Sequence, residues 1–391
     1  MARTRRGYED VVITAPVSVP YVRYSIRSAH WFLARALAGV IKAAGIRKDD
    51  VDGLCVSSFT LAPDTAVGLT QHLGVSPRWL DHVPMGGACG VVSLRRAARA
   101  VQAGDAEIVA CLAGDTHQVD SFRLMLGSFS QFARDAVYPY GSGGPNASFA
   151  FLTDHYMRTY GAKREDFGKL CVAQRDNALA FPLALFKKPL TLEEYLEAKA
   201  VAAPLHLFDC VMPCAGAEAF LVMTRERAAG LGLRYARILS TIERHNAYPD
   251  DPIQMRGGWA VDRDELYGLA GVAPRDVDFL ETYDDYPVIS FLQIEDLGFC
   301  AKGGAAEFVR QHTFTCGGDF PVNTSGGQLS VGQAGAAGGF LGLVEAVRQL
   351  IDAPLGSAVP DARIGLVAGF GMINFDRGLC SGAALLARSA L

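Results

Sequence analysis

Cys89 is the side chain of this sequence best suited to nucleophilic chemistry. It lies in a glycine-rich run, residues 86–90, and residues 94–102 that follow have the apolar spacing of a helix. The start of a helix favours a thiolate, because backbone N–H groups and the helix dipole stabilise negative charge there. Cys89 is therefore a candidate nucleophile. The alternative is a small buried residue packed beneath the loop.

Other side chains could serve as a base or as metal ligands. His82, His117 and His245 are candidate bases for such a nucleophile, because imidazole exchanges protons near neutral pH. Cys210 and Cys214 form a C-x3-C pair, but no second pair with zinc-ligand spacing accompanies it. We interpret this pair as structural and expect no metal site.

The elements that must position these residues come in two copies. Residues 44–52 and 270–278 resemble each other at a constant offset of 226 positions. Each copy joins a helix end, marked by a glycine, to an apolar strand. The order of elements that follows is also repeated, a helix and then a buried strand: 94–102 and 108–113 in one half, 339–350 and 364–368 in the other. This duplication predicts two packed α/β halves with mixed sheets, at 1–240 and 241–391.

A long segment, about residues 118–215, has no counterpart in the second half and is interpreted as an inserted loop region. Insertions on a duplicated scaffold are natural places for substrate contacts. Within it, the turn at 186–189 carries Lys187, which could bind a phosphate. The alternative is an ordinary solvated turn.

The bulk composition limits the classes of partner. The chain has 391 residues, half of them apolar, and a net charge of −4, which gives no support to binding of nucleic acid or an anionic membrane. The basic N-terminus lacks the apolar core of a signal peptide, and no apolar stretch is long enough to span a bilayer. Nine cysteines, several in apolar runs, are interpreted as reduced thiols. We therefore expect a cytoplasmic protein.

The duplicated halves, the insertion and the run at residues 323–333 together resemble the thiolase superfamily, and its sterol-carrier-protein-x branch most closely. Residues 205–219 and 281–300 also match that branch. The resemblance implies a five-layered αβαβα fold, a homodimer, a coenzyme A thioester as substrate and no bound cofactor. The positions that it implies for substrate or coenzyme A contacts, with the basic turn added, are Gly87, Asn323, Gly326, Gly327, Gly371 and Lys187.

The catalytic positions of a thiolase are replaced in this sequence. The resemblance places the nucleophilic cysteine at Gly87, two residues before Cys89, and the histidine of the Gly-His-Pro run at Gln333. Glutamine can donate a hydrogen bond to a carbonyl or enolate oxygen but cannot exchange a proton near neutral pH. The family's second histidine becomes Tyr283, and its catalytic asparagine becomes Ile289. No cysteine stands near 369–372, where a C-x-Gly loop is expected.

This pattern is most similar to the thiolase-like aldolases of bacterial steroid side-chain breakdown, which carry glycine for the cysteine and use tyrosines. The resemblance implies retro-aldol cleavage of a β-hydroxyacyl-CoA without a covalent acyl-enzyme. Tyr283 falls on one of the two tyrosines and Gln333 on the other. Asp284 or Asp285 could orient Tyr283 or serve as base, or could cap a helix, which we favour for Asp285. Those aldolases work with a small partner that has a zinc ribbon and an oligonucleotide-binding-type fold.

Two further functions remain open. One is acyl transfer by Cys89, shifted into the nucleophile's place, with one of the histidines as base. The other is a non-catalytic subunit that binds acyl-CoA or a partner. The aromatic residues of the insertion could line an apolar acyl pocket or could pack its own core: Phe122, Phe129, Phe132, Tyr138 and Tyr140.

Overall fold

The computed structural model describes residues 7–117, 121, 125, 130–131, 133–141, 144–374 and 377–389. Phe122, Phe129 and Phe132, which we considered for an acyl pocket, lie outside these residues. The other two aromatics of that set are open to solvent, Tyr138 at 49% and Tyr140 at 84%. An apolar pocket built from these two side chains is therefore not formed within this chain.

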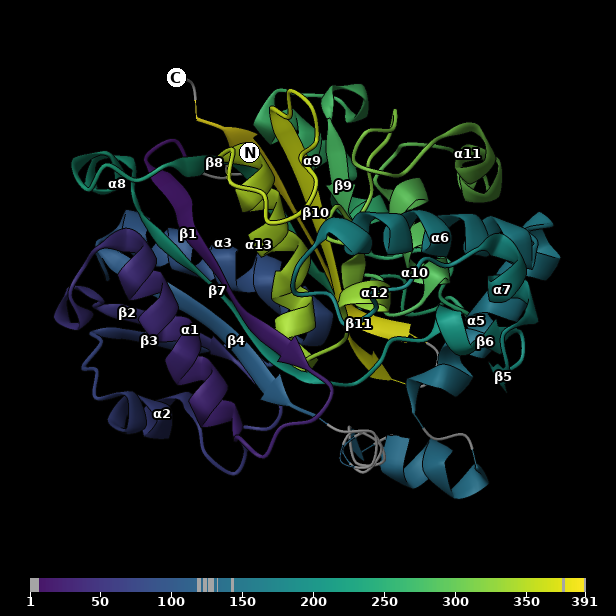
Figure 1. Cartoon of the computed structure of the whole chain (residues 1–391), viewed down its shortest axis with the longest axis horizontal. Helices are drawn as coiled ribbons and strands as arrows, with labels where there is room; N and C mark the ends of the chain where they lie inside the picture. Colours follow the sequence, from purple (N-terminus) through teal and green to yellow (C-terminus); the bar gives the residue numbers. More distant parts are fainter. Residues whose placement is uncertain are drawn as a thin grey trace.

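Nine strands form one sheet in the order β3-β2-β4-β7-β1-β8-β11-β10-β9 (Figure 1). The strands are β1 (Val11–Val22), β2 (Gly53–Ser57), β3 (Trp79–His82), β4 (Ile108–Thr116), β7 (Ala215–Thr224), β8 (Tyr235–His245), β9 (Phe279–Glu281), β10 (Ile364–Asn374) and β11 (Arg377–Arg388). Each half is mixed, because β3, β2 and β4 run parallel, as do β9 and β10, whereas the other neighbouring strands are antiparallel.

The two halves are joined where β1 pairs with β8 over three residue pairs, Val12 with Arg237, Ile13 with Ala236 and Thr14 with Tyr235. The separate mixed sheets that the sequence predicted are therefore continuous at this short pairing. The expected boundary at residue 240 falls inside β8, which pairs with β1 of the first half and β11 of the second.

Helices cover the outer faces of both halves and fill the space between them. The outer helices of the first half are α1 (Ala29–Ala44) and α2 (Ala66–Leu73), the central ones are α3 (Cys89–Ala103) and α13 (Gly338–Leu350), and those of the second half are α9 (Gly258–Ala270) and α10 (Pro287–Asp296). Side chains alternate between these layers along the strands, as the period of two requires. In β7, Phe220 and Val222 join the central core with α3 and α13, whereas Leu221 and Met223 join the outer core with α1. The five-layered α/β architecture predicted from the sequence is confirmed.

The internal repeat extends to individual hydrogen bonds. Asp50 accepts a bond from the backbone N–H of Arg47 at 2.8 Å, and Asp276 accepts the same bond from Ala273 at 2.8 Å. Two residues later in each copy, a second aspartate accepts bonds from the backbone of the next strand: Asp52 from Glu107 and Ile108, Asp278 from Arg363 and Ile364. The two copies therefore share one local design for joining a helix to a strand.

The inserted segment is largely helical. Its main helices pack beside α10 and near the short α12 (Figure 1). They are α5 (Pro145–Tyr160), α6 (Arg164–Ala180) and α7 (Leu192–Glu197), with the short strands β5 (Ala200–Ala202) and β6 (Leu205–His206). Among the described residues, the remaining helices of four residues or more are η3 (Ala133–Val137), α8 (Arg225–Gly230), α11 (Ala305–Gln311) and α12 (Gly327–Val331). Within the described ranges, no helix is long and apolar enough to cross a membrane.

Candidate functional site

Gly87 and Tyr283 meet where the loops of the two halves converge. Gly87 lies in the short helix η2 (Gly86–Ala88), directly before α3. A Cβ atom added to Gly87 would overlap with the ring of Tyr283 and with the carbonyl oxygen of Phe370. The tyrosine ring thus lies in the space that a side chain at position 87 would need.

Tyr283 is fixed both at its backbone and at its hydroxyl. Its N–H donates to Gln293 Oε1 at 3.0 Å, and Gln293 Nε2 donates to its carbonyl oxygen at 2.8 Å. Its hydroxyl donates to Asp285 Oδ2 at 2.8 Å. Burial, reinforced by the charge of Asp285, raises the pKa of Tyr283 well above its ordinary value. The phenol is therefore a proton donor at neutral pH.

Asp284 is a buried structural acceptor. Its Oδ1 accepts from the backbone N–H of Gln328 at 2.9 Å, and its Oδ2 accepts from Gln174 Nε2 at 3.0 Å and from Leu329 N at 3.3 Å. These backbone donors belong to the first turn of α12, so Asp284 caps a helix more than 40 residues away in the sequence. Burial raises the pKa of Asp284 to about 6, and the backbone hydrogen bonds oppose that shift.

Asp285 does not cap a helix, so the interpretation favoured from the sequence is wrong. The helix that follows, α10, begins at Pro287, with Tyr286 in the capping position and no side-chain cap. The carboxyl group of Asp285 turns instead toward the Tyr283 hydroxyl. Burial raises the pKa of Asp285 to about 7, against the effect of the hydrogen bond from Tyr283. The sequence placed these two side chains two residues apart but gave no sign that they face each other.

Gln333 lies at the same site and is held by its own loop. Its Oε1 accepts from Gly335 N at 2.8 Å, and its Nε2 donates to Gly335 O at 3.3 Å. Its side chain is also close enough to the Tyr283 hydroxyl to lower the pKa of that group slightly against the larger effect of burial. Gln333 can therefore orient a polar atom near Tyr283 without taking up a proton.

Asp115, which the sequence analysis did not single out, supports this loop from the first half. It lies near the end of β4 and is itself fully buried. Its Oδ1 accepts from the backbone and hydroxyl of Thr60, both at 2.6 Å, from Phe59 N at 2.9 Å and from Ser58 Oγ at 2.8 Å. Its Oδ2 accepts from Ala336 N at 2.7 Å, in the short helix η7 (Gly335–Ala337). One carboxylate thus ties the two halves together beside Gln333.

Cys89 lies near Tyr283 but is not poised as a thiolate. The thiol is fully buried, and its Sγ donates to the carbonyl oxygen of Ala336 at 3.2 Å. Burial raises the pKa of the Cys89 thiol far above its ordinary value. Of the two interpretations of Cys89, these observations agree with the small buried residue beneath the loop, because the desolvation of a fully buried sulfur outweighs the favourable position at the start of a helix.

The three candidate histidines are dispersed over the first half and β8. His245 pairs with Glu243 at 2.9 Å and its side chain is 49% exposed. His82 ends β3. His117 is buried near Asp115, and burial lowers its pKa. The ring that lies beside Gly87 is that of Tyr283.

The glycines and Asn323 shape the loops around the site. Asn323 Oδ1 accepts from Thr282 N at 2.7 Å, which fixes the chain directly before Tyr283. Gly327 has a φ of +62°, and a Cβ there would overlap with the Asp284 carboxylate. A Cβ on Gly371 would overlap with Met85 O and would lie 2.9 Å from Gly87 N. These positions leave room for close backbone approach.

Lys187 is bound within its own loop. Its ammonium donates to the carbonyl oxygen of Phe181 at 2.6 Å within its own loop. The neighbouring Phe186 pairs its N–H with Ser330 O at 3.2 Å, and the Arg175 guanidinium lies 4.5 Å from its ring. The phosphate contact predicted for Lys187 would require the ammonium to leave that carbonyl.

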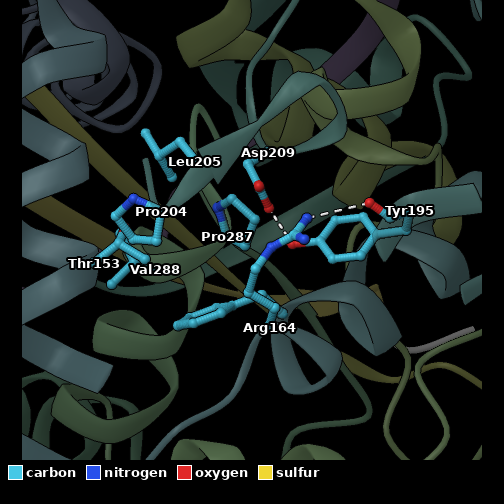
Figure 2. A pocket seen from close by; sticks show the side chains of 9 residues that line it. Thr153, Arg164, Tyr195, Pro204, Leu205, Asp209, Pro287 and Val288 are labelled. Atoms are coloured by element: carbon cyan, nitrogen blue, oxygen red, sulfur yellow. Dashed lines mark hydrogen bonds between the residues drawn. The ribbon is translucent and has the colours of Figure 1, made fainter. Parts of the chain in front are cut away.

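A small cavity lies behind the site, between the inserted segment and the start of α10. Figure 2 shows Arg164, Tyr195 and Asp209 converging there, with Tyr195 Oη donating to Asp209 and Arg164 donating to the backbone of Tyr195. Its volume is about 10 Å³, close to the space that one water requires. This cavity is too small for an acyl group, and the side chains around it hold the insertion against α10.

Among the described residues, no group of three or more His, Cys, Asp or Glu side chains is arranged to hold a metal ion. Cys210 and Cys214, the pair with C-x3-C spacing, are both free thiols.

Comparison with known proteins gives consistent matches over most of the chain. A family model described as thiolase C-terminal domain-like matches residues 257–379. A steroid side-chain-cleaving aldolase of Thermomonospora curvata is 32% identical over 345 residues, which cover 84% of this chain and 87% of the relative. A 17-hydroxy-3-oxo-4-pregnene-20-carboxyl-CoA lyase of Mycobacterium tuberculosis is 30% identical over 349 residues, which cover 84% and 88%.

Solved structures agree with these relatives. An Ltp2-ChsH2(DUF35) aldolase superposes with a TM-score of 0.82 at 27% identity, covering 97% of this chain and 98% of the other. An acetyl-CoA acetyltransferase from Syntrophomonas wolfei superposes with a TM-score of 0.70 at 16% identity, covering 97% and 100%, which is a likeness of fold alone.

Proposed function

This chain belongs to the thiolase superfamily, as do the thiolase-like aldolases, and we propose that it catalyses the reaction of those aldolases. The proposed reaction is retro-aldol cleavage of a β-hydroxyacyl-CoA without a covalent acyl-enzyme. The main support is the place of Tyr283. Its ring fills the space beside Gly87 in which a nucleophilic side chain would stand, and its hydroxyl is bound to a carboxylate. The site thus offers proton transfer where a thiolase offers a thiol.

The reaction needs a base for the β-hydroxyl proton and donors for the oxygen of the departing thioester enolate. Tyr283 is the group proposed to exchange the proton. The Gln333 amide and the backbone N–H groups around Gly87 and Gly371 are proposed to polarise the thioester carbonyl. Asn323, Gly326, Gly327 and the cap formed by Asp284 are proposed to shape the substrate contacts, and Lys187 to meet a phosphate of coenzyme A.

Acyl transfer by Cys89 is the alternative that some relatives would suggest, since an acetyl-CoA acetyltransferase of Methanocaldococcus jannaschii is 28% identical over 365 residues. The buried, protonated state of the Cys89 thiol argues against it. A non-catalytic role would leave unexplained why a carboxyl group with a pKa of about 7 lies buried against a tyrosine hydroxyl.

We further propose a homodimer, a small partner protein and a cytoplasmic setting. The sheet has two edge strands, β3 and β9, and β9 is hydrogen-bonded to the segment 321–323, so β3 is the edge proposed to pair with a second copy. The similar solved structure pairs its aldolase with ChsH2(DUF35), which supports a partner of that kind. Nine free thiols suit a reducing compartment.

The test is an assay of β-hydroxyacyl-CoA thioesters with and without such a partner, beginning with 17-hydroxy-3-oxo-4-pregnene-20-carboxyl-CoA, the compound named for one relative. We expect an aldehyde or ketone together with a shortened acyl-CoA. Tyr283→Phe should remove turnover, whereas Tyr24→Phe, a change at a hydroxyl on an exposed surface, should not. A labelled acyl group trapped on Cys89 would instead establish acyl transfer. Binding of acyl-CoA without turnover would support the non-catalytic role.

A further inference from the structure

The carboxyl groups of Asp284 and Asp285 are neighbours at the site but differ in how many of their oxygens accept a hydrogen bond. Both oxygens of Asp284 are occupied by donors from α6 and α12. Asp285, which is 91% buried, accepts the Tyr283 hydroxyl on Oδ2, but its Oδ1 has no hydrogen-bond partner among the described residues. A buried carboxylate oxygen without a donor is costly, and a catalytic role is one explanation for such a group.

Tyr283 alone cannot take up the substrate's proton. Its pKa is raised well above the ordinary value of a phenol, so the phenolate is almost absent at neutral pH. The carboxyl group that accepts its hydrogen bond is a far better proton acceptor, since the pKa of Asp285 is about 7. The tyrosine hydroxyl can therefore accept the substrate's proton only if it passes its own proton to Asp285 at the same time.

Among the titratable groups that face this pair, Asp285 is the carboxyl group with an oxygen left to accept a proton. The titratable side chains that face Tyr283 or Asp285 are Asp284 on the same loop, Cys89 at the start of α3 and Tyr286 before α10. Asp284 is held by backbone donors, and burial raises the pKa of Cys89 and Tyr286 well above neutrality. The pKa of Asp285 is raised by burial and by the charge of Asp284, and it is lowered by the hydrogen bond from Tyr283.

We infer that Asp285 is the proton acceptor of the reaction, acting through Tyr283, and that this one pair carries out both proton transfers. The inference rests on the proposed function. In cleavage, the β-hydroxyl proton passes to Tyr283 Oη while the tyrosine proton passes to Asp285 Oδ2. The Cα–Cβ bond breaks, its electron pair forms the thioester enolate, and the C–O bond becomes a carbonyl.

The second proton transfer runs in the opposite direction, from Tyr283 to the substrate, and its acceptor is Cα instead of the β-oxygen. After the ketone or aldehyde has formed, Tyr283 donates its proton to Cα of the enolate, and Asp285 returns its proton to Tyr283. No proton is gained or lost overall. Gln333 stands where a second acid or base would be needed for a two-residue mechanism, and an amide cannot fill that role. Asp285 therefore acts as a positioning and proton-storing residue behind Tyr283.

The test compares Asp285→Asn with the wild-type enzyme over pH 5.5–9. Asparagine keeps the size of the side chain and an acceptor oxygen for Tyr283 but cannot store a proton. We expect wild-type kcat/KM to rise with pH and level off above an apparent pKa near 7. In Asp285→Asn we expect kcat to fall by about 100-fold or more and KM to stay within a few fold. The rise of kcat/KM with pH, called the pH limb below, should disappear.

Asp284→Asn is the matched control, since it removes the neighbouring carboxylate of the same loop. It should lower the melting temperature by loss of the α12 cap, while any remaining activity still rises with pH. That rise should move to lower pH, because Asp284 raises the pKa of Asp285. If Asp285→Asn fails to fold, the wild-type pH profile still decides the matter, because a flat profile between pH 6 and 8 would overturn the inference.

Full activity of Asp285→Asn with an unchanged pH limb would also overturn it. In that case, loss of turnover in Tyr283→Phe would still support the proposed aldolase activity. If wild-type protein cleaves no β-hydroxyacyl-CoA at all, with or without a partner, it is the proposed function that fails.

Discussion

The ring of Tyr283 occupies the volume that a side chain at Gly87 would fill, so the two positions cannot both carry large side chains. The glycine lies in η2 of the first half and the tyrosine follows β9 of the second half, nearly 200 residues later. A side chain at position 87 and the phenol ring of Tyr283 therefore exclude each other. The proposed proton transfer by Tyr283 depends on the glycine at this position.

Substitution of Gly87 by alanine should therefore displace Tyr283. The added methyl group would overlap with the ring, and overpacking of this kind costs about 1–3 kcal/mol. We expect turnover of the β-hydroxyacyl-CoA to fall by at least about 10-fold, because a small displacement of a catalytic group is costly. Kinetics and thermal unfolding measure the two effects.

Gly268→Ala is the control for that substitution. Gly268 lies in α9, where an added Cβ meets no atom within 4 Å, so stability should stay the same or rise slightly. Equal loss of activity in both variants would refute the steric relationship between positions 87 and 283.

Cys89→Ala separates the aldolase from acyl transfer. The substitution removes a buried sulfur and should cost about 1 kcal/mol in the free energy of unfolding. Aldolase turnover should survive within about 10-fold, since the thiol is bound to Ala336 O and takes no part in the proposed steps. Alkylation followed by mass spectrometry should modify Cys89 only after unfolding. Rapid native alkylation, together with a dead Cys89→Ala enzyme, would favour acyl transfer.

The fold could be predicted from the sequence because its signals are local and repeated. Gly45 and Gly271 end their helices in the left-handed conformation, and the aspartates after them bind neighbouring backbone in both copies. The site was only partly predictable. Tyr283, Gly87 and Gln333 were found through family resemblance, and the structure brings them together.

The roles of Asp115 and Asp285 could not be predicted from the sequence, because the spacing of nearby residues does not indicate their contacts. Asp115 binds Ala336, 221 residues away, and no pattern around either residue indicates that pairing. Asp285 was interpreted as a helix cap, because aspartate before a helix is typical of one. Its true role depends on which of two adjacent acids turns toward Tyr283, and tertiary packing decides that.

Asp115→Asn should weaken the junction of the two halves. The amide keeps one acceptor oxygen but would turn N–H groups toward the donors that now bind the carboxylate. Loss of such buried charged hydrogen bonds costs about 3 kcal/mol or more. Activity should fall as well, because Ala336 adjoins the Gly335 backbone that holds Gln333. Chemical denaturation and kinetics test this, with exposed Asp250→Asn as control; unchanged stability would contradict it.

Glu218 should make folding stability depend on pH. It is fully buried in β7, accepts Ser18 Oγ at 2.5 Å, and burial raises its pKa to about 8. In the unfolded chain its pKa is about 4.3. The folded state thus binds the Glu218 proton more tightly than the unfolded chain does. The contribution of this proton to the free energy of unfolding is fully present below about pH 4.3 and is lost as pH rises through about 8.

Glutamine at position 218 cannot ionise, so Glu218→Gln should remove this dependence. We expect the stability of the wild-type protein relative to Glu218→Gln to fall between pH 5 and pH 9 by at least about 1.4 kcal/mol, the free energy of one pH unit for one proton. The change is measured by urea denaturation at each pH. Glu107→Gln, at an exposed position, should show a difference that does not vary with pH. A parallel pair of curves for wild type and Glu218→Gln would mean that Glu218 stays ionised in the folded protein, held by Arg348 through Ser18.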